Sequence, residues 1–488
     1  MKQNLADRLS NYALSLKYSA LPQSTIHEVK RRVIDSVGCA LGAFYEEPSV
    51  YSRTVASRVT TPDTNAATLW GTRTKSAVDL AAFNNGIMTR YFDFNDTYLS
   101  KEPAHPSDNI APLFAVAEAE RKSGKDLIKS IAIAYEIQCR LCDAASIRKH
   151  FWDHVNYGNF SVTLGLAPLM GLTPEQTSHA QGLAAAPHCA MRQTRAGTLS
   201  MWKGCAFGNT SRNAAFAALL AREGMSGPAP IFEGEMGFEV LLSHGKINLP
   251  KLGGVGKNGF MIDITSIKYV PVEYHAQAGV QLGLQFRKEI LETVGAQSLR
   301  PSATISKRAQ ATAPLHTQDI ADSVKDILIR TFDAAVDIIA GDPSKWNPTT
   351  RETADHSLPY CVAAAMLDGQ VWHEQFDEKR IRDPKILKFL KKIRVKRDAA
   401  CNKKYPATIP TDIEVTLKNG KKIRKAMDAP PGHAKNPMTD KQVEDKFIAN
   451  TEKKLTPEQQ RATMDRLWRL DEVADVGELP PLFVLRES

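Results

Sequence analysis

The stretch "KDLIKSIAIAYEIQCRLCDAA", residues 125–145, has the pattern of a long helix that is apolar on almost every side. Its apolar residues recur at i, i+3 and i+4 spacing, which is the period of an α-helix. A helix of this kind has to be covered by neighbours all round. The stretch therefore predicts a buried central layer of helices.

The same spacing extends over most of residues 1–265. Three of the segments that carry it are "STIHEVKRRVIDSVGCALGAF", "AVDLAAFNNGIMTRYF" and "NIAPLFAVAEAERKSG". The triplet Thr173-Pro174-Glu175 predicts a helix start, with proline at the first helical position. We expect a large helical domain from this part of the chain.

The pattern changes at about residue 260. The segments "FMIDITSIKYVPVEYH" (260–275), "ILIRTF" (327–332) and "TDIEVTLKNGKKIRKAM" (411–427) are typical of strands, and Asn419-Gly420 predicts a hairpin in the last of them. Polar helices return near the C-terminus. The sequence thus predicts a mainly α protein with an α+β lid: residues 1–267 and 437–488 build the helical domain, and 268–436 the lid.

Bulk composition excludes several classes of protein. A chain of 488 residues is long enough for two or three domains, and its 43% hydrophobic and 24% charged content is typical of a globular protein. No segment approaches eighteen uninterrupted apolar residues, and the N-terminus has no apolar signal core. We expect a cytoplasmic protein with no membrane partner.

The seven cysteines predict a reducing compartment rather than a disulfide framework. Cys139 and Cys142 form a C-x-x-C inside a helical pattern, which favours two buried thiols over a redox or metal pair. No set of three cysteines is spaced to hold an iron–sulfur cluster.

The net charge of +9 is concentrated in two late runs, "KFLKKIRVKR" (388–397) and "KNGKKIRK" (418–425). Almost no aromatic residues are interleaved with these basic residues, so a nucleic-acid partner is not expected. We interpret the runs as solvated strand faces, and a field that attracts small polyanions stays open as the alternative.

Three polar segments each lead directly into a predicted helix. The first, "RYFDFNDTYLSKEPAHPSDN" (90–109), is followed by an apolar helix that Ser107 or Asp108 can cap. The second contains "HFWDHVNYG" (150–158), and the third contains "MRQTRAGTLSMWKG" (191–204). Helix N-termini, arginine and lysine all bind carboxylates, so convergence of the three would make a pocket for a small polycarboxylate.

A fourth polar segment, "IKYVPVEYHAQ" (267–277), lies at the predicted domain junction, where Lys268 and His275 could close over a substrate. Two charged residues stand among apolar neighbours and need a partner of opposite sign. They are Asp93, between two phenylalanines, and Lys203, in "LSMWKGCAF". For most other histidines a structural role is the better interpretation.

The motifs "DFNDTYLSKEPAHPSDN", "MWKGCA", "KYVPVEYHAQ" and "DPSKWNPTTRETADHSLPY" resemble those of the MmgE/PrpD family, the group of 2-methylcitrate dehydratases and cis-aconitate decarboxylases. The resemblance covers nearly the whole chain. It implies a helical domain with a smaller α+β lid, a homodimer, a cleft site, and neither metal nor organic cofactor.

The resemblance also implies roles for single residues. Asp93, Thr97 and His105 match the decarboxylase motif, Lys203 and Lys268 match its two lysines, and His154 matches its middle-domain histidine. The chain departs from the decarboxylase pattern in a longer Thr97–His105 interval and in "PVEYHAQ", both of which resemble the dehydratase branch. The resemblance therefore favours a hydro-lyase, a carbon–oxygen lyase of propionate metabolism acting on 2-methylcitrate or citrate.

Dehydration of a 2-hydroxy tricarboxylate needs acid–base side chains for both the proton and the hydroxyl. We expect His105, beside Asp93, to be the main proton-transfer residue, with His154 or His275 as its counterpart. The expected carboxylate ligands and orienting hydroxyls are Arg90, Arg192, Lys203, Lys268, Thr97 and Ser107. The alternatives are a cis-aconitate decarboxylase, an iminodisuccinate-type epimerase, and a non-catalytic polyanion-binding helical protein.

Overall fold

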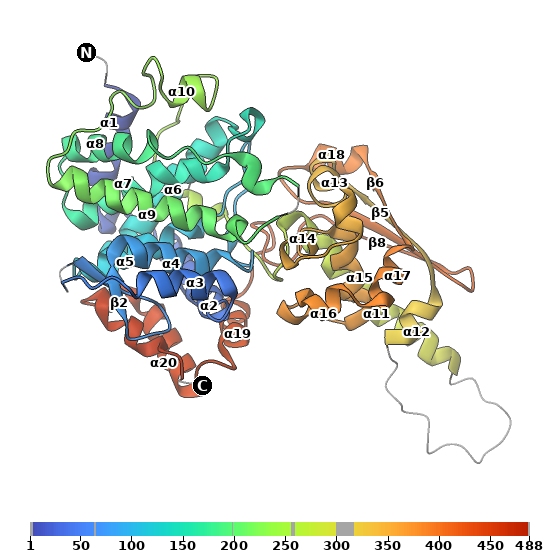
Figure 1. Cartoon of the computed structure of the whole chain (residues 1–488). Coiled ribbons are helices and arrows are strands. Elements are labelled where there is room, and N and C mark those ends of the chain that lie inside the picture. The colour runs from blue at the N-terminus through green and yellow to red at the C-terminus, as the bar shows by residue number, and fades with distance from the viewer. Residues whose placement is uncertain (1–2, 63–64, 198, 255–258, 299–316, 487–488) are drawn as a thin grey trace. The chain divides into compact units, whose positions relative to one another are not determined.

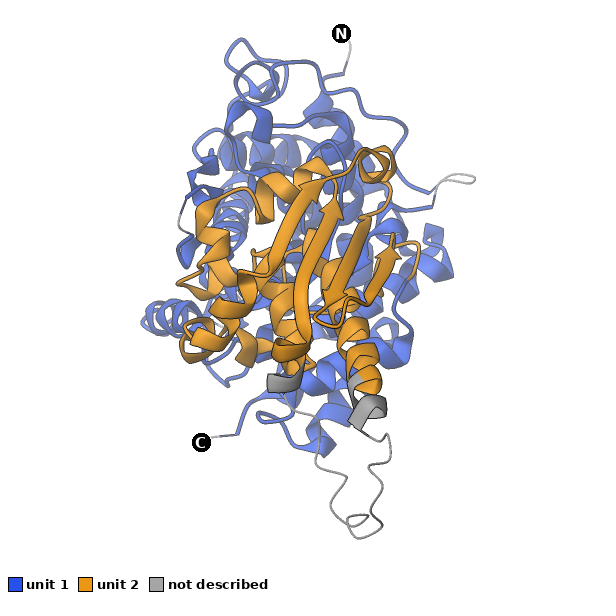
Figure 2. Ribbon diagram, turned by 90° about the vertical axis from the view of Figure 1, so that its right-hand side faces the viewer, with its two compact units in different colours: residues 1–267, 437–488 blue, residues 268–436 orange. Residues whose placement is uncertain are grey.

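A computed structural model describes residues 3–62, 65–197, 199–254, 259–298 and 317–486. The chain forms two compact units, one of residues 1–267 with 437–488 and the other of residues 268–436. Figure 1 shows the elements in chain order, and Figure 2 colours the two units separately.

Helix α6, Gly124–Ala144, is a long buried helix of the larger unit. Most of its residues are buried, which confirms the interpretation of the sequence. Ser123 caps the helix by accepting a hydrogen bond from the Asp126 amide at 3.3 Å. The cysteines Cys139 and Cys142 are free and buried in this helix, and burial raises the pKa of both thiols well above the usual value.

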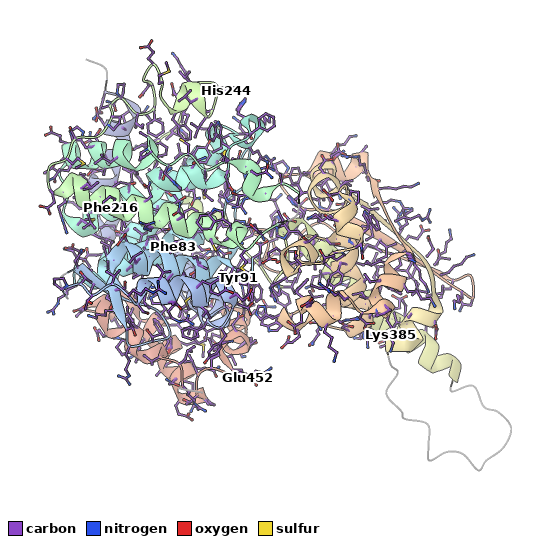
Figure 3. All side chains as sticks on the ribbon, in the orientation of Figure 1. Phe83, Tyr91, Phe216, His244, Lys385 and Glu452 are labelled. Carbon is purple, nitrogen blue, oxygen red and sulfur yellow. The ribbon has the colours of Figure 1, made fainter. Side chains whose placement is uncertain are left out.

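The larger unit contains further helices before its C-terminal segment. They are α1 (Leu5–Ser15), α2 (Gln23–Gly42), α3 (Glu47–Ala56), α4 (Val78–Arg90), α5 (Ile110–Ala119), α7 (Gly158–Met170), α8 (Pro174–Ala185) and α9 (Trp202–Arg222). Helix α9 packs against α4, α7 and α8 and presents Phe216 to solvent (Figure 3). The predicted start of α8 is confirmed, because Thr173 forms a capping box with Gln176.

The C-terminal segment returns to the larger unit as α19 (Asp440–Thr451) and α20 (Pro457–Trp468). A buried ion pair joins α19 to α2, with Lys446 Nζ 2.6 Å from Asp35 Oδ1. The same ammonium donates to the Phe94 carbonyl at 2.6 Å and lies 3.8 Å from the centre of the Phe94 ring. The end of the chain thereby holds the loop that follows α4.

The smaller unit contains a four-stranded sheet in the order β6-β5-β7-β8. Its strands are β5 (Val324–Thr331), β6 (Ile393–Arg397), β7 (Thr411–Leu417) and β8 (Lys422–Met427). Strands β5 and β6 are parallel, and β7 is antiparallel to both β5 and β8. The hairpin predicted at Asn419-Gly420 is confirmed, and Gly420 adopts the left-handed conformation (φ 88°) that such turns use.

Alternate residues of β7 are buried, so the sheet has one apolar face. The long helices of the smaller unit are α11 (Gln277–Ser298) and α15 (Leu358–Asp368). On the polar face the basic residues are paired with acids: Arg394 with Asp326, and both Arg330 and Arg424 with Asp412. The late basic runs thus contribute to a solvated strand face, as expected.

One expected strand is wrong. The segment 260–275 contains a 3₁₀ turn at Met261–Ile264, the two-residue strand β4 (Ser266–Ile267) and a second 3₁₀ turn at Tyr274–Ala276. After β4, the Gln277 side chain provides the hydrogen bonds that a neighbouring strand would otherwise make with the backbone. Its amide oxygen accepts from the Tyr269 and Val270 amides, and its nitrogen donates to the Val270 carbonyl.

Two further features bear on function. None of the described helices is both long and apolar enough to cross a membrane. In the same described part of the chain, no three His, Cys, Asp or Glu side chains are grouped so that they could hold a metal ion.

The start of α6 lies against the backbone of the C-terminal segment. A Cβ at Gly124 would stand 1.7 Å from the Leu470 carbonyl oxygen, which cannot move aside as a flexible side chain could. We predict that Gly124→Ala lowers the free energy of unfolding by about 1–3 kcal/mol or more, because the two segments must separate. Thermal denaturation measures the effect. Gly245→Ala is the control, since no atom lies within 4 Å of its added Cβ. Equal melting temperatures for the two variants would contradict this packing.

Candidate active site

The segment 90–109 folds back over the start of α5. After α4 ends, Asp93 adopts a left-handed conformation (φ 50°), and β3 (Asp96–Thr97) pairs with β4. Tyr98 and Ala104 then exchange two backbone hydrogen bonds of 2.9 Å, which close a short hairpin. His105 follows directly, before a 3₁₀ turn at Pro106–Asn109. A rare backbone conformation and a hairpin thus present Asp93 and His105 on one loop.

The Asp93 carboxylate is buried and surrounded by cationic groups. It is ion-paired with Arg90, its Oδ2 lies 3.4 Å from Lys203 Nζ, and its Oδ1 lies 3.9 Å from His105 Nε2. Asp93 and Lys203 both stand among apolar neighbours in the sequence and need partners of opposite charge. In the fold they pair with each other, and Arg90 also pairs with Asp93.

Lys203 is the second residue of α9 and reaches Asp93 because α9 lies close to the end of α4. The neighbouring Gly204 permits this approach, since a Cβ there would meet the Tyr91 ring at 3.0 Å. Tyr91 is the residue that follows α4, and its position can be seen in Figure 3. The "WKG" triplet therefore combines a cation with the small residue that brings it into the site.

The tautomer of His105 follows from its backbone partner. Its Nδ1 lies 2.7 Å from the Asp96 carbonyl oxygen, which can only accept, so Nδ1 carries a hydrogen. The other nitrogen, Nε2, is the one that lies towards Asp93. Nε2 is therefore the ring nitrogen that can gain or lose a proton while the bond to Asp96 stays in place.

Buried polar side chains that pack against this loop form hydrogen bonds with one another. Asp96 accepts from the Ser107 amide (2.9 Å), the Ser107 hydroxyl (2.6 Å) and the Tyr135 hydroxyl (2.8 Å), while Asp108 accepts from Asn95. Burial raises the pKa of the Asp96 carboxyl, and it raises that of Asp108 to about 7. This network fixes the shape of the loop from beneath.

The predicted cap of α5 is wrong. The residue before the helix is Asn109, and it makes no side-chain capping bond. Ser107 and Asp108 are instead occupied by Asp96 and Asn95. The 3₁₀ turn that leads into α5 replaces a capping side chain, and the sequence pattern could not distinguish the two.

His154 approaches His105 from the second polar segment, with ring centres 5.8 Å apart. Its Nδ1 lies 2.9 Å from Asp153 Oδ1, and the other oxygen of Asp153 lies 3.0 Å from Arg195 Nε. Within the described residues the His154 Nε2 is buried and has no hydrogen-bond partner. The second and third polar segments thus meet at Asp153. The rings of His105 and His154 lie next to each other.

Burial and the positive charge of Arg195 lower the pKa of His154 to about 4, although Asp153 opposes them. Burial alone would raise the pKa of Asp153, but Arg195 and His154 hold it well below its usual range. At neutral pH His154 is therefore a neutral imidazole, with its Nδ1 hydrogen directed at Asp153 and an unprotonated Nε2.

Two other predicted residues contribute differently. The Thr97 hydroxyl donates to the Ala104 carbonyl at 3.2 Å and so holds the hairpin before His105. Arg192 is half-buried on the 3₁₀ turn Arg192–Arg195, and its amide donates to the Phe151 carbonyl. Burial and Arg148 lower the pKa of its guanidinium. Arg192 lies beside the loop of His154 rather than in contact with Asp93.

Lys268 and His275 belong to the smaller unit, where both act on Glu273. His275 Nδ1 lies 2.8 Å from Glu273 Oε1, and its amide donates to Glu273 Oε2 at 2.7 Å. Although burial opposes the ionised form, His275, His356 and Lys268 lower the pKa of Glu273 to about 2. The part of these residues in a common site with the larger unit stays a prediction.

Sequence reasoning assigned no role to Asp153 or Asp355, and it named Arg195 only as a member of the third polar segment. Asp153 and Arg195 fix His154, and Asp355, whose carbonyl accepts from the Glu273 amide, also bonds to His356. The adjacent Asp-His pairs at 153–154 and 355–356 were the available signal, since a carboxylate next to a histidine can fix its tautomer.

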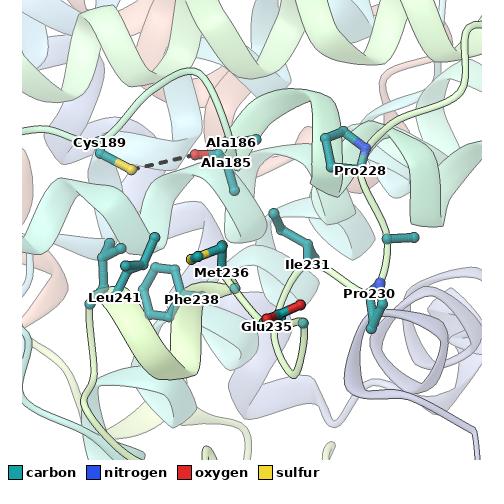
Figure 4. A pocket seen from close by; sticks show the side chains of 14 residues that line it. Ala185, Ala186, Cys189, Pro228, Pro230, Ile231, Glu235, Met236, Phe238 and Leu241 are labelled. Carbon is teal, nitrogen blue, oxygen red and sulfur yellow. Dashed lines mark hydrogen bonds between the residues drawn. The ribbon is translucent and has the colours of Figure 1, made fainter.

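A surface cavity of the larger unit lies elsewhere. It has a volume of about 300 Å³ and is lined mainly by apolar residues from the end of α8 and the segment 228–242. Figure 4 shows Met236, Phe238 and Leu241 along it, and the Cys189 thiol hydrogen-bonded to the Ala185 carbonyl. None of the predicted site residues lines this cavity.

Residues 7–249 match the MmgE/PrpD N-terminal domain, and residues 270–470 match the MmgE/PrpD C-terminal domain. The chain belongs to the MmgE/PrpD family. The resemblance found in the polar motifs is therefore confirmed.

Relatives within the family include two kinds of enzyme. The chain is 29% identical to the 2-methylcitrate dehydratase of Cupriavidus necator, over 88% of this chain and 87% of the relative. It is 26% identical to the 2-methylcitrate dehydratase of Escherichia coli strain K12, over 99% and 96% of the two chains. It is 24% identical to the cis-aconitate decarboxylase of Homo sapiens, over 99% and 95%.

The environment of His154 predicts its titration. Its folded-state pKa of about 4 lies below the value of about 6.5 for a free imidazole, so the unfolded chain binds the proton first as pH falls. The contribution of His154 to stability is therefore complete above pH 6.5 and declines between about 6.5 and 4, by about 3 kcal/mol. Imidazole nitrogen NMR, assigned with His154→Gln, should show a neutral ring at pH 5.5. A His154 that titrates near 6.5 would contradict this environment.

Proposed function

We propose that this MmgE/PrpD protein is a cofactor-independent hydro-lyase that removes water from a 2-hydroxy tricarboxylate such as 2-methylcitrate or citrate. The observation that carries the proposal is the pair of histidines with 5.8 Å between ring centres, each held in one tautomer by its own acceptor, next to a cationic cluster. Similarity to 2-methylcitrate dehydratases over most of the chain supports it.

The two histidines suit opposite halves of the elimination. Neutral His154, with its unprotonated Nε2, can take the proton from the carbon next to a carboxylate. The electrons of that C–H bond form the double bond as the C–O bond breaks. His105 delivers a proton from Nε2 to the departing hydroxyl, which leaves as water. Asp93, 3.9 Å away, stabilises the imidazolium that His105 must form before this step.

The cationic residues suit the substrate's carboxylates. Lys203 and Arg90 lie together at Asp93, so a carboxylate bound there would share their charge as negative charge develops on the substrate. Arg192, and Lys268 with His275 from the smaller unit, are proposed as further ligands. Thr97 and Ser107 are proposed to hold the His105 loop, because their hydroxyls donate within it.

A cis-aconitate decarboxylase is the second candidate, because the human decarboxylase is similar over nearly the whole chain. The two activities share proton chemistry on a tricarboxylate and differ in the bond that breaks. Loss of carbon dioxide from cis-aconitate gives itaconate, whereas dehydration gives an unsaturated tricarboxylate. An iminodisuccinate-type epimerase would return a saturated stereoisomer, and no observation on this chain favours it or a non-catalytic role.

The setting of the reaction is also a proposal. All seven cysteines are free, which suits a reducing cytoplasm. One relative, from Yarrowia lipolytica, is named a mitochondrial 2-methylcitrate dehydratase, so fractionation of the source cells is the direct test. We propose that the protein is a homodimer, which analytical sedimentation tests. We also propose that it acts in propionate metabolism, which growth of a deletion strain on propionate tests.

Product analysis tests the activity. Wild-type protein incubated with 2-methylcitrate, citrate and cis-aconitate should release an unsaturated tricarboxylate from at least one hydroxy acid, seen by absorbance and by NMR in D₂O. Itaconate as the sole product would favour the decarboxylase. No turnover of any of the three acids would contradict both candidates.

His105→Ala should reduce kcat by about 10²–10⁴-fold, because general acid–base transfer contributes about that much. His179→Ala is the matched control, since His179 lies on α8, 3.8 Å from Glu175, outside the Asp93 cluster. The measurement is steady-state turnover of the substrate identified in the panel. Activity of His105→Ala within twofold of wild type would remove His105 from the mechanism.

A further inference from the structure

Glu102 is a buried carboxylate that the mechanism above does not use. It lies within the hairpin closed by Tyr98 and Ala104, three residues before His105, and its amide donates to the Cys142 carbonyl at 3.1 Å. The backbone of this residue is therefore fixed to the end of α6.

The Glu102 side chain reaches across to a different segment. Its Oε2 accepts from the Ser146 hydroxyl at 3.0 Å and from the Arg148 amide at 2.9 Å. Arg148 is the first residue of the 3₁₀ turn Arg148–His150, whose first amides have no partner within the turn. The carboxylate supplies that partner, and so fixes the start of the segment that leads to His154.

The segment beyond this turn has little freedom before it reaches His154. Phe151 takes the left-handed conformation (φ 68°), and the Asp153 amide donates to the Ala190 carbonyl at 3.0 Å. A shift at Arg148 would thus be transmitted along a short, bent chain to His154. Since Glu102 lies three residues before His105 on the same loop and its carboxylate accepts from Ser146 and Arg148, it connects the segments that carry the two histidines.

We propose that Glu102 is a positioning residue that sets the spacing of His105 and His154 by joining the hairpin before His105 to the segment before His154. The proposal rests on the proposed function for its kinetic consequences. Its geometric consequence, the contact between the two rings, does not depend on any activity.

Burial raises the pKa of Glu102 to about 7, although the Arg148 amide and charge oppose it. The site therefore accommodates an uncharged carboxyl close to neutral pH. Glutamine is the matched conservative replacement, because its carbonyl oxygen can accept both hydrogen bonds. Alanine removes both bonds and leaves the Arg148 amide without its acceptor.

Asp143 provides a control on the same hairpin. It accepts from the Tyr98 hydroxyl at 2.7 Å and from the Ser100 hydroxyl at 2.5 Å, and so anchors the hairpin to α6 alone. Asp143→Asn therefore perturbs the hairpin without loosening the bonds to Ser146 and Arg148. Ser146→Ala removes one of the two Glu102 bonds with little risk to folding, and serves if Glu102→Ala does not fold.

We expect Glu102→Ala to lower kcat by about 10–100-fold with KM changed less than about threefold, because displacement of a catalytic group acts mainly on the chemical step. Glu102→Gln and Asp143→Asn should stay within about threefold of wild type, and Ser146→Ala should lie between. When His154→Ala is already present, Glu102→Ala should add less than about twofold.

The nuclear Overhauser contact between the His105 and His154 rings supplies the readout that needs no substrate. It should be present in wild type, Glu102→Gln and Asp143→Asn, and weakened in Glu102→Ala. An unchanged ring contact in Glu102→Ala, equal losses in Glu102→Ala and Asp143→Asn, or a full additional loss in the His154→Ala background would each overturn the proposal. If no acid is turned over, the proposed function fails while the ring contact still decides the role of Glu102.

Discussion

The buried carboxylate of Asp93 is the constraint on which the rest of the site depends. An ionised carboxylate at this depth is unfavourable unless cations and hydrogen bonds compensate it. Arg90, Lys203 and His105 provide that compensation from three places in the sequence. The helix packing that brings α9 against α4, and the left-handed turn at Asp93, are the conditions under which the three can meet.

The two histidines differ because their surroundings differ. His105 is held through a backbone carbonyl and lies at the edge of the Asp93 cluster, whereas His154 is enclosed with an ion pair whose positive member lowers its pKa. At neutral pH His154 is kept neutral by burial and Arg195, whereas His105 lies beside the Asp93 carboxylate, so the two rings meet charges of opposite sign. Arg195, the ion-pair partner of Asp153, contributes to this difference because its charge lowers the pKa of His154.

Much of the helical fold could be predicted because a buried helix such as α6 requires a continuous apolar pattern, which the sequence displays. The strand expected over 260–275 is confined to Ser266–Ile267, because beyond it the Gln277 side chain, and not a neighbouring strand, bonds the backbone of Tyr269 and Val270. In the site, Asp93 and Lys203 stood out as charges among apolar neighbours, and His105 stood out as a histidine in a polar segment before a helix. Arg195 and Glu102 did not, because their partners lie 42 and 44–46 residues away and only the folded chain brings them together.

The central proposal is that Asp93 acts in the chemical step, by stabilising protonated His105. Calorimetry of tricarboxylate binding, together with kcat, for Asp93→Asn tests it directly, once thermal denaturation has shown that the variant is folded. Loss of the negative charge leaves Arg90 and Lys203 more attractive to an anion but removes the group that stabilises protonated His105. The account predicts binding as tight as wild type or tighter, with kcat lowered at least about 100-fold. Binding and kcat lost in equal proportion, or kcat unchanged, would contradict it.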